Sequence, residues 1–247
     1  MAKISEKAVQ MPASAIRKLV PFADAAKKQG VKVYHLNLGQ PDIKSPVCAL
    51  DAVRNYSLEN VSYSHSAGLM ELRKGLVEKY YRKIGIDLTV DELIVTVAGS
   101  ESVNLALEIT CNPGDEVIVL EPFYTNYNTF AFMNGLTLKA IPTDIRNGFQ
   151  IPPIEEFEKA ITDKTKAILV CNPGNPTGTQ YSKESMLALG EIARKHDLFL
   201  LSDEVYREFC YTDEPHFSAM NIPGLEQNVV LIDSVSKRYN LCGARVG

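Results

Sequence analysis

The chain has 247 residues, enough for one large domain or two small ones, and its 45% hydrophobic and 23% charged residues are ordinary for a soluble globular protein. A formal net charge of -4 argues against nucleic acid or an anionic membrane as the main partner. The first residues lack the apolar core of a signal peptide, and no apolar run is long enough to span a bilayer.

The cysteines and histidines exclude two further classes of protein. The five cysteines are scattered and odd in number, which predicts reduced thiols in a cytoplasmic protein. None of the four histidines lies two to five residues from another, so we expect no metal site.

Residues 1–42 lack the regular alternation of elements seen later, and we interpret them as an amino-terminal arm. Ser14 is the predicted N-cap of a helix that starts at residue 15, ends at Lys28 and is closed by Gly30.

Residues 43–247 are predicted to form one large domain. Ser45-Pro46 begins a helix, because proline in the first turn loses no hydrogen bond. After a loop at 63–68, an amphipathic helix is expected over 69–84.

From residue 93 onward the pattern becomes strand, turn and helix, repeated. The predicted strands cover 93–97, 116–120, 137–141, 166–170, 199–201 and 229–232, and the predicted helices cover 101–110, 124–133, 154–161 and 182–196. Such alternation implies a parallel sheet with helices on both faces. The expected fold class is therefore α/β, a three-layer, doubly wound and mainly parallel sheet with an amino-terminal arm.

Ligands of such sheets bind outside the carboxyl ends of the strands, and five strand ends here carry polar or aromatic groups. The backbone N–H groups of Gly99 and Ser100 at a helix start form a candidate anion site, although most such starts serve only as caps. Ser234, Ser236 and Arg245 add hydroxyl groups and a fixed positive charge, which suit a phosphate.

The segment Asn172–Gly178 is a more specific indication of a functional site than the helix start at Gly99 and Ser100. Two Asn-Pro steps and two glycines keep this backbone out of helix and strand, so that an asparagine amide can be aimed rigidly. The alternative is a plain connecting turn.

Other strand-end residues have both a chemical and a structural interpretation. Asp203 lies among apolar neighbours and would need a cationic partner, either a ring nitrogen or, as is commoner, an arginine such as Arg207. Tyr206 could donate to a phenolic oxygen, and Tyr124 could stack on a flat ring or simply belong to the core. Lys237 is placed for chemistry, whereas a lysine alone is more often a surface residue.

Asn172–Gly178 and Ser234–Gly247, taken with Asp203, resemble the pyridoxal-phosphate-dependent aminotransferases of fold type I, specifically the class I/II group that includes aspartate and aromatic aminotransferases. The resemblance runs from about Ser14 to Gly247. It implies pyridoxal 5'-phosphate as the cofactor and an amino acid and a 2-oxo acid as substrates.

The resemblance also implies a role for each residue. Lys237 would form the internal aldimine and then move the substrate's alpha proton, and Asp203 would hold the pyridine nitrogen. Asn175 and Tyr206 would bind the phenolic oxygen, and Tyr124 would stack on the ring. The groups implied at the phosphate are Gly99, Ser100, Ser234 and Arg245, with Ser236 as a helper.

Two residues of the implied site come from the first part of the chain. Tyr63 corresponds to a tyrosine that reaches the phosphate site of the neighbouring subunit in a homodimer. Gly39 corresponds to a glycine whose backbone contacts the substrate carboxylate, and Asn175 is implied there too.

The implied activity is transfer of an amino group between an L-amino acid and a 2-oxo acid through an aldimine and a quinonoid intermediate. The same residues would serve a carbon–sulfur lyase or a decarboxylase, and a non-catalytic sensor or a structural remnant are further alternatives. Ser100 stands where some aspartate aminotransferases have a lysine, so a dicarboxylic substrate is not supported at that position.

Members of this family continue well beyond the position of Gly247, with an antiparallel strand and a carboxy-terminal small domain. We therefore interpret the chain as a fragment of a longer enzyme. We expect it to bind the cofactor poorly alone, to transaminate little or not at all, and to expose an unpaired sheet edge that favours aggregation.

Overall fold

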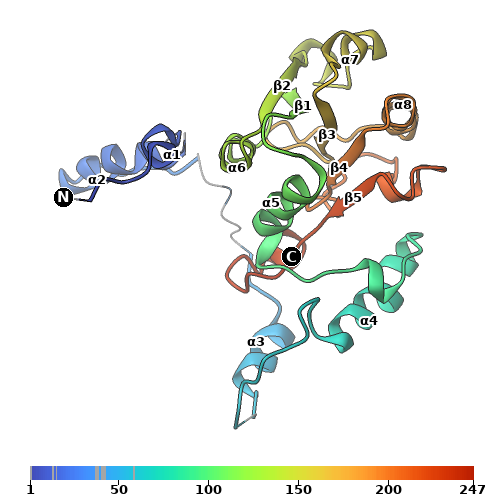
Figure 1. Ribbon diagram of the computed structural model, residues 1–247. Coiled ribbons are helices and arrows are strands. Elements are labelled where there is room, and N and C mark those ends of the chain that lie inside the picture. Colours follow the sequence, from blue (N-terminus) through green and yellow to red (C-terminus); the bar gives the residue numbers. More distant parts are fainter. Residues whose placement is uncertain (1, 13, 15, 37–38, 40–42, 58) are drawn as a thin grey trace.

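A computed structural model provides the structure of the chain and describes residues 2–12, 14, 16–36, 39, 43–57 and 59–247 (Figure 1). A single sheet of five strands forms its centre, in the order β2-β1-β3-β4-β5. The strands are β1 (Glu116–Glu121), β2 (Thr137–Pro142), β3 (Thr165–Cys171), β4 (Phe199–Asp203) and β5 (Val229–Ile232). Every pairing is parallel, which confirms the predicted α/β class.

Helices cover both faces of the sheet and make the fold three-layered (Figure 1). They are α5 (Ala98–Thr110) and α6 (Asn126–Asn134) on one face, and α7 (Ile154–Ala160) and α8 (Lys183–Lys195) on the other. Alternate side chains of β1 point to opposite cores: Val117 and Val119 pack with α5 and α6, and Ile118 packs with α7 and α8. Both faces of β1 are buried, as the apolar run predicts.

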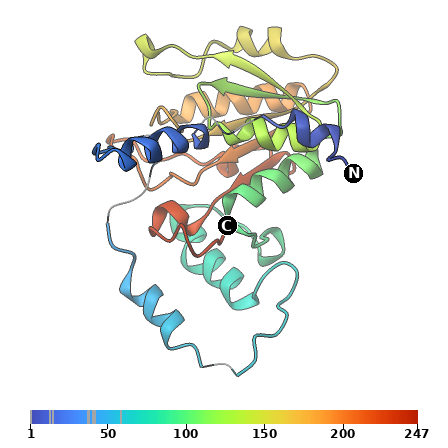
Figure 2. The same cartoon turned by 90° about the vertical axis from the view of Figure 1, so that its left-hand side faces the viewer.

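The amino-terminal part lies outside both cores. None of the helices α1 (Glu6–Gln10), α2 (Val20–Lys28) and α3 (Val47–Arg54) has a buried residue. Helices α1 and α2 lie on the side of the sheet that α6 covers, and α3 lies apart from the sheet (Figure 2). No helix among the described residues has an apolar stretch long enough to cross a membrane.

The first predicted helix differs from the observed one at its start. Residue 15 lies outside the described residues, and a short 3₁₀ turn (Arg17–Leu19) precedes α2. The Ser14 hydroxyl accepts from the Arg17 N–H at 3.3 Å, and Gly30, with φ of +79°, follows the end of α2 as predicted.

The helix predicted over 69–84 is divided in two. Helix α4 (Met70–Lys79) ends at Tyr80, and a 3₁₀ turn (Tyr81–Ile84) leads to Gly85. The break turns the Tyr80 and Tyr81 hydroxyl groups toward carboxylates, because Tyr81 donates to Asp233 at 3.0 Å and Tyr80 donates to Glu208. Long-range hydrogen bonds therefore override the local helical pattern.

The strand predicted over 93–97 is wrong. These residues belong to no strand of the sheet, and Ile94 and Val97 are 64% and 60% exposed. Thr96 instead exchanges backbone hydrogen bonds with Gly247 in both directions, at 2.8 and 3.0 Å, which is the bonding of a single antiparallel pair. An apolar run becomes a strand only where a neighbouring strand takes up its backbone groups.

The packing of α8 yields a stability prediction. A Cβ atom at Gly190 would lie 2.6 Å from Ile222 Cγ2 and 3.1 Å from Leu225 Cδ1. Gly190→Ala should therefore lower the free energy of unfolding by about 1 kcal/mol net, because overpacking outweighs the gain in helix propensity. Urea unfolding measures this change.

Gly75→Ala in α4 is the matched control, because a Cβ atom there would have no neighbour within 4 Å. It should stabilise the chain by about 0.5–1 kcal/mol. Equal effects of the two substitutions would contradict this description of the α8 packing.

Candidate active site

The polar strand-end residues predicted from the sequence gather at the carboxyl edge of the sheet. The connection after β1 leads to β2 on one side, and the connection after β3 leads to β4 on the other side. The β1–β3 boundary is therefore a topological switch point, where α/β sheets bind ligands. The register aligns Cys171 with Asp203 and Asp203 with Ile232, so the ends of β3, β4 and β5 are level. Segments that follow these strands therefore face a common space.

Asp203 ends β4 and is buried, with 5% of its surface exposed. Its Oδ2 accepts a hydrogen bond of 2.7 Å from the Tyr127 hydroxyl, and its Oδ1 lies 3.4 Å from the Val205 N–H. Burial raises the pKa of Asp203 to about 6, although the Tyr127 hydrogen bond opposes the rise.

Arg207, the alternative partner for Asp203, pairs with other carboxylates. Its Nη2 lies 2.9 Å from Glu204 Oε2, and its Nε lies 3.9 Å from Asp233 Oδ2. Among the described residues, Asp203 therefore has a phenol but no cation as its partner.

Tyr127 is a site residue that the sequence reasoning missed. It lies in α6, is fully buried, and meets the Tyr124 ring edge-on with the centroids 5.5 Å apart. Burial also raises the pKa of its hydroxyl, which therefore stays a hydrogen-bond donor to Asp203. The three-residue spacing from Tyr124, which puts two side chains on one helix face, is the signal that could have found it.

Asn175 and Tyr206 lie next to each other. The Asn175 Nδ2 lies 3.4 Å from the Tyr206 hydroxyl, and the Lys237 Nζ lies 5.9 Å from the centroid of the Tyr206 ring. Burial raises the pKa of Tyr206 to about 12, and the neighbouring Cys171 and Asp203 contribute in the same direction. An amide and a neutral phenol together offer N–H and O–H donors to an anionic oxygen.

The segment that carries Asn175 is tied down by its own hydrogen bonds. The Gly174 N–H donates to the Thr179 carbonyl and the Gly178 N–H donates to the Gly174 carbonyl, both at 2.8 Å. The buried Asn172 Oδ1 accepts from the Tyr181 N–H at 3.0 Å. These bonds hold the turn in one shape, as expected of a segment that aims an amide.

The anion site predicted at a helix start faces the serine segment. Helix α5 starts at Ala98, three residues before the predicted start, so Gly99 and Ser100 lie in its first turn. A Cβ atom at Gly99 would lie 3.7 Å from Ser234 Cβ. Ser234 caps the short helix α9 (Val235–Arg238), and its Oγ accepts from the Ser236 N–H at 3.2 Å.

Three predicted site residues are not drawn into this cluster. Arg245 is exposed, and its Nη1 donates to the Cys242 carbonyl at 2.8 Å. Tyr63 is fully exposed on the loop between α3 and α4. Gly39 is exposed too, and residues 37, 38 and 40–42 around it lie outside the described residues.

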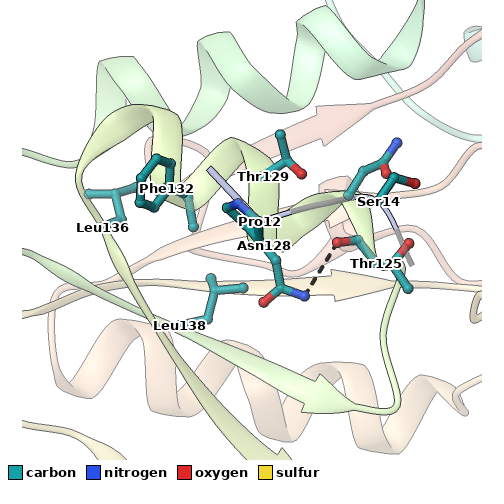
Figure 3. A pocket seen from close by; sticks show the side chains of 10 residues that line it. Pro12, Ser14, Thr125, Asn128, Thr129, Phe132, Leu136 and Leu138 are labelled. Carbon is teal, nitrogen blue, oxygen red and sulfur yellow. Dashed lines mark hydrogen bonds between the residues drawn. The ribbon is translucent and has the colours of Figure 1, made fainter. Parts of the chain in front are cut away.

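A groove lies beside the cluster, between the amino-terminal arm and α6 (Figure 3). Pro12 and Ser14 line it from the arm, and Thr125 and Asn128 line it from the start of α6. The Asn128 Nδ2 donates to the Thr125 carbonyl at 3.3 Å. Because Thr125 directly follows Tyr124, the arm borders the candidate site.

Comparison with known proteins places the chain in a family. Residues 31–247 match the model of "Aminotransferase class I and II", and the chain belongs to this family. It is 34% identical over 248 residues to the aspartate/prephenate aminotransferase of Thermus thermophilus, and it covers 63% of that protein.

Solved structures show the same fold. The aspartate aminotransferase of Thermotoga maritima superposes with a TM-score of 0.91 at 33% identity, over 99% of this chain and 65% of that one. The alanine aminotransferase of Pyrococcus furiosus gives 0.88 at 33% identity, over 99% of this chain and 62% of that one. The chain thus spans a little under two thirds of the length of these relatives.

The raised pKa of Asp203 predicts how stability depends on pH. Because the folded pKa of about 6 lies above the ordinary 3.8, the folded chain holds this proton more tightly than the unfolded chain does. The stabilisation is complete below pH 3.8 and is lost as pH rises through about 6. The loss amounts to about 3 kcal/mol.

Urea unfolding between pH 4 and 8, without added ligand, tests this in the wild type and in Asp203→Asn. As pH rises across this range, the free energy of unfolding of the wild type should fall by about 3 kcal/mol relative to that of the variant. Asp213→Asn, at an exposed carboxylate, should follow the wild type. If the difference in free energy of unfolding between the wild type and Asp203→Asn did not change with pH, it would contradict the burial of this carboxylate without a compensating cation.

Proposed function

We propose that the chain is the cofactor-binding part of a pyridoxal-phosphate-dependent aminotransferase that moves amino groups between an L-amino acid and a 2-oxo acid. The observation that carries the proposal is Asp203: a buried carboxylate with no cationic partner among the described residues, at the level where Tyr206, Asn175 and Lys237 converge. A protonated pyridine nitrogen is the partner that this carboxylate lacks.

The surrounding groups fit the rest of the cofactor. Gly99 and Ser100 lie in the first turn of α5, and Gly99 lies beside Ser234. Their N–H groups would suit a phosphate, with Ser236 and Arg245 as further donors. Asn175 and Tyr206 would hold the phenolic oxygen, and the Tyr124 ring would stack on the pyridine ring.

Lys237 is the residue that would react. Its amine would hold the cofactor covalently, and as a free amine it would take and return the substrate's alpha proton. Bound pyridoxal phosphate supplies the electron sink for that proton transfer, and the ion pair with Asp203 would keep the ring nitrogen protonated.

Transamination is favoured over the other reactions because the compared relatives are named aminotransferases. The cofactor residues alone would equally serve a carbon–sulfur lyase, a decarboxylase or a sensor. The names include aspartate, prephenate and alanine, and Ser100 gives no cation for a distal carboxylate, so we propose an amino acid without naming its side chain.

We further propose the division into an arm (1–42) and a large domain (43–247). A homodimer would give the exposed Tyr63 a role at the partner's phosphate site and would bring Gly39 to the substrate. The cytoplasmic location stays a prediction.

Borohydride trapping tests the role of Lys237. The chain is incubated with pyridoxal phosphate, its absorption spectrum is recorded, the adduct is reduced, and the labelled peptide is identified by mass. The label should lie on Lys237 and be lost in Lys237→Ala, whereas Lys164→Ala, at an exposed lysine, should keep it. A label spread over surface lysines in the wild type would contradict the proposal.

A further inference from the structure

A second cluster of charged and phenolic side chains, mostly buried but with Glu208 exposed, lies next to the lysine-bearing segment. It contains Tyr80, Tyr81, Glu204, Arg207, Glu208, Asp233 and Arg238. Its centre is the ion pair between Asp233 and Arg238, the residues on either side of Ser234–Lys237.

Arg238 contacts Asp233, Tyr80 and Glu208. Its Nη2 lies 2.9 Å from Asp233 Oδ1 and 2.6 Å from Asp233 Oδ2, and the two side chains are only 6% and 8% exposed. Its guanidinium carbon lies 4.0 Å from the centroid of the Tyr80 ring, and its Nε lies 3.5 Å from Glu208 Oε1. Removing one partner of such a buried pair would leave an uncompensated charge, and the planar guanidinium fork permits few alternative geometries.

Asp233 ties the same segment to two other elements. Its Oδ1 accepts from the Ser234 N–H at 2.7 Å, and its Oδ2 accepts from the Tyr81 hydroxyl at 3.0 Å. Arg207, four residues after the end of β4, adds a second positive charge, with its Nε 3.9 Å from Asp233 Oδ2. One carboxylate thus joins the end of β5, the start of α9 and the break after α4.

This anchoring matters because α9 has only four residues. A helix of one turn is not stable by itself, so its direction depends on side-chain contacts. The ion pair closes a ring around Ser234, Ser236 and Lys237. Adjacent helical side chains point about 100° apart, so fixing Arg238 toward Tyr80 also fixes the direction of Lys237 toward Tyr206.

We propose that Asp233 and Arg238 are positioning residues for the reactive lysine: their buried ion pair sets the direction of Lys237 and links it to the Tyr80–Tyr81 break. The proposal rests on the proposed role of Lys237 as the cofactor-binding amine. Neither residue touches the cofactor; both act through the backbone of α9.

The test compares Arg238→Gln, Asp233→Asn and the double variant, with Lys159→Gln as a control that breaks an exposed ion pair with Glu156. Borohydride labelling of Lys237 by pyridoxal phosphate should fall about tenfold in each single variant and no further in the double variant. Arg238→Lys should recover part of the labelling, because lysine keeps the charge but not the planar fork. Lys159→Gln should label like the wild type.

Two readouts separate positioning from loss of stability. Visible circular dichroism per bound cofactor should change in the variants, because it reports orientation rather than the amount of folded protein. Without cofactor, amide hydrogen exchange should become faster at 234–240 and at Tyr80–Tyr81, while the β1 and β3 amides keep their wild-type rates.

Wild-type labelling and dichroism in both single variants would overturn the proposal, and so would equal loss of exchange protection across the whole sheet. If Arg238→Gln fails to fold, Arg238→Lys and Asp233→Glu make the same comparison with the charges retained. If the wild type itself is not labelled at Lys237, the proposed function fails, and exchange at 234–240 alone decides whether the pair fixes the segment.

Discussion

The candidate site depends on one constraint: a carboxylate at the end of a core strand must be accommodated without water. Asp203 reaches this position because β4 runs between β3 and β5 and ends level with both. A single phenolic hydrogen bond does not offset the burial, and the pKa of Asp203 therefore rises to about 6. The surrounding groups are arranged as if for a cationic, planar ligand.

The neighbouring carboxylates Asp203 and Glu204 have different surroundings. Glu204, next to Asp203 in sequence, faces the opposite way and accepts hydrogen bonds from Ser202, Ser218 and the Ala219 N–H, besides pairing with Arg207 and His216. Burial would raise its pKa, but the His216 hydrogen bond and the Arg207 charge lower it. Glu204 thus has charged and hydrogen-bonding partners within the chain, whereas Asp203 has no cationic partner among the described residues.

The sequence predicted most of the sheet because its strands are apolar runs bounded by turn residues, and it predicted the site because parallel strands end at one edge. Local spacing could place Tyr127 near Tyr124, but it could not show its hydrogen bond to Asp203, 76 positions away. Nor could it show that Asp233 and Arg238, five positions apart, form a buried ion pair. The same limit explains two of the differences between prediction and structure. The break at Tyr80 depends on distant carboxylates, and within 93–97 the backbone of Thr96 pairs with Gly247 rather than with one of the five strands of the sheet.

The most direct test of this account is a carbon-13 NMR titration of the Asp203 carboxyl, assigned by its absence in Asp203→Asn. The account predicts a pKa of about 6 in the free chain, which falls when pyridoxal phosphate is added, because a cationic nitrogen favours the carboxylate. An ordinary aspartate pKa in the free chain, unchanged by the cofactor, would contradict the central claim.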